Sequence, residues 1–205
     1  MKIATAFLLA GAIAVGAAAC DESPVAPEQS EAQFVKKGLP QPSLPTIVDI
    51  VVADDGEFDA LQIVVVESGL APALSGNRPY TVFAPTDAAF GALFDFLGVP
   101  GDTPEEQAAN ACAGGCPDFV VTTVLYHVVN GRRYSNSVLG ARQLTTLMGD
   151  RLFPDGASLN TTCPNSANIV TTTPGATFDI PAKNGVIHVI DAVLLPEEVC
   201  AALAP

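Results

Sequence analysis

The sequence predicts an α+β domain, with helices in its first half and a meander of short strands in its second half. Between residues 46 and 131, apolar side chains recur at helical spacing, interrupted by one β-rich run at residues 80–84. From residue 144 onward the apolar runs are short and are separated by turn-forming Gly, Pro, Asn and Asp. Helices followed by a series of strands favour an α+β domain over a parallel α/β sheet.

The helices of the first half are marked by capping residues and an apolar face. Thr46 and Thr86 stand where a side-chain oxygen can accept a hydrogen bond from a free helix amide. Residues 98–117 between the last two helices contain several Gly and Pro and are predicted to form a loop. The predicted helices cover residues 46–52, 58–69, 86–97 and 118–127.

The strands of the second half end with a turn and a long apolar run. Asn184-Gly185 is a strong turn signal, because both residues tolerate positive φ. In the last strand, alternation places His188 and Asp191 on opposite faces, so they cannot readily form a catalytic dyad. His188 is expected to be partly exposed, and Asp191 to bind nearby backbone amides. The predicted strands after residue 140 are 144–147, 151–153, 158–162, 169–173, 177–180 and 186–193.

The N-terminus has the pattern of an export signal. Lys2 precedes an uninterrupted run of apolar and small residues that ends at Ala19, directly before Cys20. This pattern predicts a lipoprotein signal peptide over residues 1–19, with Cys20 as the lipidated residue. Ala17 stands where such signals usually have Leu, and the alternative is ordinary cleavage that leaves Cys20 as a free thiol.

The number of cysteines favours lipidation. The chain has five, at positions 20, 112, 116, 163 and 200. If Cys20 is acylated, an even set remains, which suits two disulfides in an oxidising compartment. Three pairings are possible. We favour Cys112–Cys116, which is local, together with Cys163–Cys200, which would attach the C-terminal tail to the meander.

The segment after Cys20 predicts a tether that precedes one folded domain. Residues 20–45 contain five prolines and too few apolar residues to fold alone. A flexible chain of this length reaches on the order of 25–30 Å. Residues 46–200 have a suitable length for a single domain. We therefore expect the protein to be exported and anchored by lipid to a bacterial membrane, on the periplasmic side or at the cell surface.

The charge of the chain limits its partners. The net charge is −13, and removal of the signal segment takes away one basic residue and no acidic one, which leaves −14. Such a surface repels nucleic acids and anionic lipid headgroups. The membrane contact would therefore be the lipid on Cys20, and no nucleic-acid partner is expected.

Three segments together resemble the fasciclin (FAS1) domain. They are residues 80–90 (YTVFAPTDAAF), 124–129 (VLYHVV) and 184–196 (NGVIHVIDAVLLP). The resemblance extends over about residues 46–196. It implies a wedge-shaped antiparallel β-sandwich with helices packed along one edge, and a role in adhesion or interaction with matrix, which leaves the partner open.

The resemblance also marks Tyr126 and His127 as candidate partner-binding residues. In the fasciclin family a Tyr-His pair at this point is implicated in binding integrins. The alternative is that both residues belong to the core, because His and Tyr in an apolar helix are more often packed and hydrogen-bonded. We favour the core position.

The sequence contains no motif that indicates an enzyme, a cofactor or a metal. It lacks G-x-S-x-G, H-E-x-x-H and a phosphate-binding loop. The four later cysteines could form a zinc site, but export favours disulfides. Residues 54–59 are acidic but lack EF-hand spacing, and Thr86 and Asp87 fit helix capping better than catalysis.

These observations predict a non-catalytic adhesion or interaction module, anchored to the membrane, that binds an envelope or matrix protein or a polysaccharide. The alternatives are a structural protein of envelope assembly and a small-ligand-binding domain.

Overall fold

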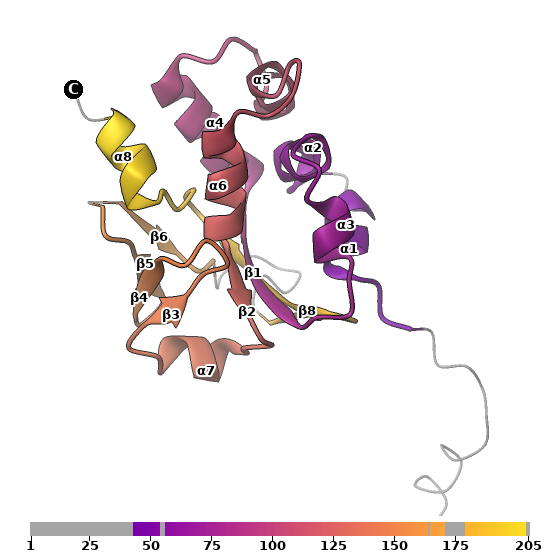
Figure 1. The fold of residues 1–205 in the computed structure, drawn as a ribbon, viewed down its shortest axis with the longest axis vertical. Coiled ribbons are helices and arrows are strands. Elements are labelled where there is room, and N and C mark those ends of the chain that lie inside the picture. Colours follow the sequence, from indigo (N-terminus) through magenta and orange to yellow (C-terminus); the bar gives the residue numbers. More distant parts are fainter. Residues whose placement is uncertain (1–42, 54–55, 164, 171–178, 204–205) are drawn as a thin grey trace, which may run out of the picture. The chain divides into compact units, whose positions relative to one another are not determined.

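The computed structural model describes residues 43–53, 56–163, 165–170 and 179–203. The segments predicted as signal peptide (1–19) and most of the tether (20–45) lie outside these residues. Along the described chain, most helices come first, interrupted by β1 and β2, and the strands from β3 to β8 follow one another before the last helix (Figure 1). The helices are α1 (Ile47–Ala53), α2 (Asp59–Glu67), α3 (Ala71–Leu74), α4 (Asp87–Leu97), α5 (Pro104–Ala111), α6 (Asp118–Tyr126), α7 (Ser135–Leu139) and α8 (Glu197–Leu203).

The strands of the described residues form two four-stranded sheets. One has the order β2-β1-β8-β7 and the other the order β3-β4-β5-β6. In the view of Figure 1, α4, α6 and α8 lie on one side of the strands and α7 on the other. The strands are β1 (Tyr80–Pro85), β2 (Val128–Asn130), β3 (Leu144–Thr145), β4 (Arg151–Asp155), β5 (Ser158–Asn160), β6 (Ser166–Asn168), β7 (Ile180–Ala182) and β8 (Gly185–Ile190).

The α+β class is confirmed, but one strand pair departs from the antiparallel arrangement that was expected. β1 pairs with β8 in parallel, from Tyr80 opposite Gly185 to Pro85 opposite Ile190. All six residues of each strand are buried. Strands covered on both faces are typical of parallel pairs. The long chain between them allows β8 to return in the same direction as β1, which a short hairpin cannot do.

Isolated bridges connect the two sheets. Val129, in β2, pairs with Thr146 just after β3, and Ile169, just after β6, pairs with Ile190 in β8. The second sheet is antiparallel throughout. The meander thus starts beside one edge of the first sheet and returns to its central strand β8.

Two clusters of buried apolar side chains form the core. The alternation of β8 supplies both: Ile187 and Val189 belong to the cluster under the helices, and Ile190 belongs to the cluster that contains Tyr126 and the β3–β6 side chains. This alternation confirms the predicted facing of the last strand.

The caps expected at two helices are present. The Thr46 hydroxyl accepts from the Asp49 amide while the Asp49 carboxylate accepts from the Thr46 amide, which is a reciprocal capping arrangement. The Thr86 hydroxyl accepts from the Ala89 amide at the start of α4. The left-handed Gly98 ends that helix.

The prediction that residues 98–117 form a loop is wrong over Pro104–Ala111, which form α5. Thr103 caps this helix by accepting from the Glu106 amide, Pro104 occupies its first turn, and Glu105 follows. This Thr-Pro-Glu-Glu order is a good start signal, which the surrounding Gly and Pro residues obscured. The short elements α3, β2, α7 and α8 were also not predicted.

Of the predicted strands of the meander, 144–147, 158–162 and 186–193 are present but end earlier, whereas 151–153 extends to Asp155. In the predicted run 169–173, the described residues 169–170 contribute the bridge at Ile169, and β6 lies just before it. Residues 171–178, which include most of the predicted strand 177–180, lie outside the described residues. β7 begins at Ile180.

Asn184 connects the final hairpin to the helices. Its side-chain oxygen accepts from the Ile47 amide at the start of α1, and its side-chain nitrogen donates to the carbonyls of Leu74 and Gly76. Its own carbonyl accepts from the Tyr80 amide that begins β1. The sequence predicted a turn at this residue but not that it would join three elements.

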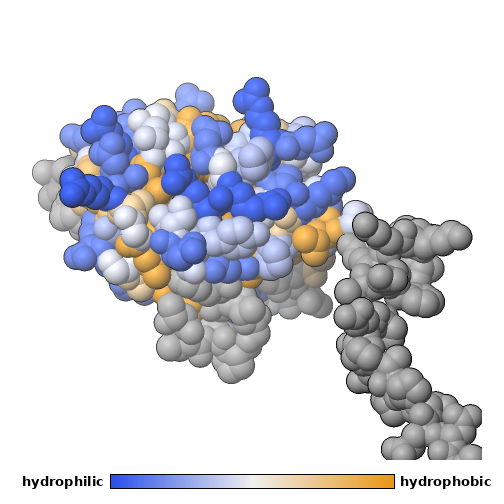
Figure 2. All heavy atoms as spheres, turned by 90° about the horizontal axis from the view of Figure 1, so that it is seen from below, coloured by the Kyte–Doolittle hydropathy of each residue, from blue (hydrophilic) through white to orange (hydrophobic). Residues whose placement is uncertain are grey.

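One face of the molecule is mostly hydrophilic. Seen from below the view of Figure 1, hydrophilic residues cover most of the visible described surface, with hydrophobic residues in smaller areas between them (Figure 2). This composition agrees with the strongly negative charge of the chain.

Candidate functional site

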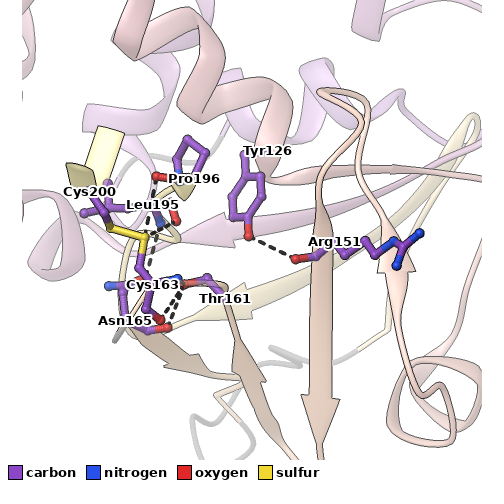
Figure 3. The surroundings of a disulfide bond; sticks show 8 residues. All are labelled: Tyr126, Arg151, Thr161, Cys163, Asn165, Leu195, Pro196 and Cys200. Atoms are coloured by element: carbon purple, nitrogen blue, oxygen red, sulfur yellow. Dashed lines mark hydrogen bonds between the residues drawn. A yellow bond between two sulfur atoms is a disulfide. The ribbon is translucent and has the colours of Figure 1, made fainter. Parts of the chain in front are cut away.

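Tyr126 and His127 end helix α6 and lie inside the molecule. Tyr126 is fully buried, and only 5% of the His127 surface is exposed. The Tyr126 hydroxyl donates to the carbonyl of Arg151 in β4, 3.1 Å away (Figure 3). The phenol therefore links α6 to the second sheet.

Both nitrogens of His127 are hydrogen-bonded to backbone. Nδ1 lies 2.7 Å from the Thr123 carbonyl oxygen, and Nε2 accepts from the Leu194 amide at 2.9 Å. This geometry assigns the proton to Nδ1, because only a protonated Nδ1 can donate to a carbonyl while Nε2 accepts. His127 thus connects α6 to the segment after β8.

Burial controls the protonation of both side chains. It lowers the pKa of His127 to about 4, against an opposing effect of the bond to the Thr123 carbonyl. It raises the pKa of the Tyr126 phenol to about 12. At neutral pH both groups are therefore uncharged members of the core, and neither presents a surface to a partner in this conformation.

The prediction that His188 is partly exposed is wrong. His188 is completely buried in the middle of β8, where its ring stacks on Phe83 with a centroid distance of 5.7 Å. Its Nε2 lies 2.9 Å from the Arg133 carbonyl oxygen, and its Nδ1 accepts a long bond from the Asp179 amide. The error arose because a strand with polar residues can be covered on both faces when it is central in its sheet.

The acidic partner of His188 is Asp179, not Asp191. The Asp179 carboxylate lies 3.8 Å from His188 Nδ1, and it also accepts from the amide and hydroxyl of Ser135 at the start of α7. Burial lowers the pKa of His188 more than the Arg133 carbonyl and Asp179 raise it. Asp191 instead accepts from the Asn168 amide, as predicted for a residue that binds nearby backbone.

Asp87 has a structural role that involves a second helix. Its two carboxylate oxygens accept from the amides of Asp59 and Ala60, in the first turn of α2. Burial raises its pKa in spite of these bonds. Oxygens of Asp59, Asp87 and Glu105 lie within 4.8 Å of one another. These carboxylates could approach a cation, but Asp87 already binds α2, and Asp54 and Asp55 of the acidic segment lie outside the described residues.

The structure forms both disulfides that the spacing of the cysteines favoured, Cys112–Cys116 and Cys163–Cys200. The second joins the segment after β5 to α8 (Figure 3). Around it, the Thr161 hydroxyl contacts the carbonyl of Asn165, whose side chain accepts from the Leu195 amide. The four cysteines are thus separated into two pairs and do not form one zinc site.

Comparison with known proteins identifies the family of this chain. The family model of the fasciclin domain matches residues 56–196, which include all three segments that resembled it. This chain belongs to the fasciclin family. The structure agrees: a fasciclin domain pair from the insect cell adhesion molecule Fasciclin I superposes with a TM-score of 0.55 at 17% identity. The match covers 75% of this chain and 52% of that pair, and at this identity it shows the fold alone.

Relatives of this fasciclin domain occur in bacteria and animals. Protein sll1483 from Synechocystis is 33% identical over 172 residues, which cover 82% of this chain and 83% of that protein. The transforming growth factor-beta-induced protein ig-h3 of Sus scrofa is 32% identical over 163 residues. The match covers 80% of this chain but only 21% of ig-h3. The fasciclin domain is therefore one part of some larger relatives.

The surface of the fasciclin domain has an apolar groove between α4 and α8. Its volume is about 570 Å³. We name it the α4–α8 groove. One wall is an apolar side of α4, and the other comes from the segment after β8 and from the end of α8. Its main lining residues are Ala89, Ala92, Leu93, Phe96, Val193 and Leu203. The sequence did not predict it, because α8 was missed.

Two further observations concern the membrane. Among the described residues, no helix is long and apolar enough to cross a bilayer. Cys20, the predicted lipidation site, lies outside the described part of the chain.

Proposed function

We propose that this fasciclin-family protein is an exported interaction module that a lipid on Cys20 anchors to a bacterial membrane. It does no catalysis and binds an envelope or matrix protein, or a polysaccharide, through its surface. The observation that supports this best is that Tyr126, His127 and His188 are all buried and bonded to backbone. General acid–base chemistry needs such groups within reach of a substrate.

The family supports an adhesive role. The fold is shared with an insect cell adhesion molecule. We place the partner-binding surface outside the Tyr126–His127 pair, since both side chains are occupied inside the core. If binding uses exposed side chains, the surface residues of each family member determine which partner it binds.

The anchor is tested by replacing one atom. We expect Cys20→Ser to move the protein from the membrane to the soluble fraction, because serine lacks the thiol that carries the lipid. The same fractionation of the double variant Cys112→Ala/Cys116→Ala, which keeps Cys20, serves as the control. Retention of Cys20→Ser in the membrane, with residues 1–19 shown by mass spectrometry to be cleaved, would refute the anchor and leave the binding role open.

The interaction role is tested by crosslinking in cells. The anchored protein is crosslinked, purified and analysed by mass spectrometry, beside a form that keeps residues 1–45 and lacks the domain. We expect one reproducible envelope or matrix partner that is captured only with the domain. If no protein is enriched and no envelope polysaccharide binds, the alternative of a structural protein of envelope assembly is favoured.

A further inference from the structure

The α4–α8 groove is lined by one apolar side of α4, on which Ala92 and Phe96 are exposed, Leu93 is half-buried and Ala89 is buried in the core. Ala89 precedes Ala92 by three residues and Leu93 by four, and Phe96 follows them by four and three, which places these residues on one side of α4. Phe96 ends this stripe with 71% of its surface exposed. An aromatic ring left in water gains free energy from any apolar group that covers it.

The size of the groove suits a small ligand. Ligand sites usually measure about 300–1,000 Å³, and the groove measures about 570 Å³. A narrower cavity beside it, lined by apolar residues together with Thr123 and His127, measures only about 50 Å³. A known apolar cavity that takes up benzene is about 150 Å³. The narrower cavity is therefore too small for such a ligand, whereas the volume of the groove is sufficient.

The walls of the groove favour a hydrocarbon over an extended peptide. Of the lining residues after β8, Leu195 already donates its amide to the Asn165 side chain, and Asp191 donates its amide to the Asn168 carbonyl. A peptide in the groove would bury its own backbone polar groups without hydrogen bonds from these amides, and burying an unbonded polar group costs free energy. An alkyl chain has no polar groups to satisfy.

The charges around the groove select the headgroup. No lysine or arginine is among the described residues that line it, and its charged lining residue is Asp191. A second groove on the other side of α8 is lined by Asp118 and Glu198 and likewise by no basic residue of the described chain. A carboxylate or phosphate head would be repelled, whereas an uncharged or cationic head would not.

We propose that the α4–α8 groove binds the alkyl chain of a single-chain amphiphile with an uncharged or cationic head. The chain lies along the stripe from Ala89 to Phe96, and the head lies toward Asp191 and Asn165. This site is independent of the adhesive role and of the lipid on Cys20.

The test measures binding of ten-carbon probes by calorimetry, below their micelle concentrations and at low salt. The protein is the Cys20→Ser chain without the signal segment 1–19, which needs no detergent. We expect decylamine and 1-decanoylglycerol to bind, and decanoate to bind at least tenfold more weakly. Shortening the chain by two carbons should raise Kd about 4-fold if half of each methylene is buried and about 15-fold if all of it is.

Variants locate the site. Phe96→Ser, which removes the exposed ring, and Ala92→Phe, which fills the groove, should each raise Kd at least tenfold. Phe153→Ser serves as the control, because Phe153 is an exposed phenylalanine of β4 that does not line the groove. The melting temperature of each variant shows whether it is folded. If Ala92→Phe does not fold, Phe96→Ser alone locates the site.

Several outcomes would overturn the proposal. Absence of binding by every probe, or binding that does not depend on chain length, excludes an alkyl site. Binding that Phe96→Ser leaves unchanged places the site elsewhere. A dimer in sedimentation that Phe96→Ser abolishes, without probe binding, would identify the groove as a contact between two copies of the chain.

Discussion

Asn184 illustrates how one side chain can hold several elements together. Its side-chain amide is buried. The amide oxygen accepts from the backbone N–H of Ile47, and the amide nitrogen donates to the carbonyls of Leu74 and Gly76. We expect Asn184→Ala to lower the free energy of unfolding by about 2–4 kcal/mol, because each buried polar group left unpaired costs about 1–3 kcal/mol and these costs partly overlap.

The measurement is urea unfolding of both proteins. Asn77→Ala is the matched control, because Asn77 is exposed in the turn before β1. Equal stability of Asn184→Ala and Asn77→Ala would show that water or relaxation replaces the three bonds.

His127 should make the stability depend on pH. Its pKa in the folded protein is about 4, below the value of about 6.5 in an unfolded chain. Between these values the unfolded chain binds more protons, so stability is full above pH 6.5 and falls as the pH drops toward 4. His127 alone should cost about 2 kcal/mol between pH 7.5 and pH 5. The lowered pKa of His188 acts in the same direction.

Denaturant unfolding at pH 7.5 and pH 5 tests this dependence in the unmodified protein and in His127→Gln. The variant should be less stable at pH 7.5 and should lose less stability at pH 5. If it also loses partner binding while its melting temperature is unchanged, His127 contacts the partner and its assignment to the core is wrong.

At the scale of elements, helix α8 depends on a covalent link. Val199 is its one buried residue among those described, and Cys200 is joined to Cys163, 37 residues earlier. Replacing both cysteines by alanine should lower the free energy of unfolding by about 2–4 kcal/mol, because the disulfide closes a long loop in the unfolded chain.

The other disulfide provides the comparison for this prediction. Cys112–Cys116 spans only four residues, so the same replacement there should cost about 2 kcal/mol or less. Differential scanning calorimetry of the two double variants measures the order. A larger loss from the short loop would show that α8 is held mainly by packing.

The elements that the sequence missed share a physical cause. Each of α3, α7 and β2 has five residues or fewer, so its apolar pattern is too short to show a period. They form because neighbouring elements hold them: Asp179 accepts from the first amide of α7, and β2 pairs with β1. Longer segments such as α4 and β8 have enough residues to reveal which face is buried.

For the whole molecule, the net charge of −14 without the signal segment predicts how it meets membranes. The chain carrying Cys20→Ser should not float with vesicles of phosphatidylglycerol at low salt, because like charges repel. The lipidated protein should float with phosphatidylcholine vesicles. Flotation of Cys20→Ser with the anionic vesicles would reveal a basic membrane-binding surface that the overall charge conceals.

By itself, the sequence determined the α+β class, the fasciclin family, the main helices and the facing of β8. These features follow from local periodicity, capping residues and short motifs. Only the tertiary structure decided the parallel pairing of β1 with β8, the complete burial of His188 and the groove beside α8. Each of these arises when segments about a hundred residues apart come together. Which segments come together depends on packing across the whole domain rather than on any local pattern.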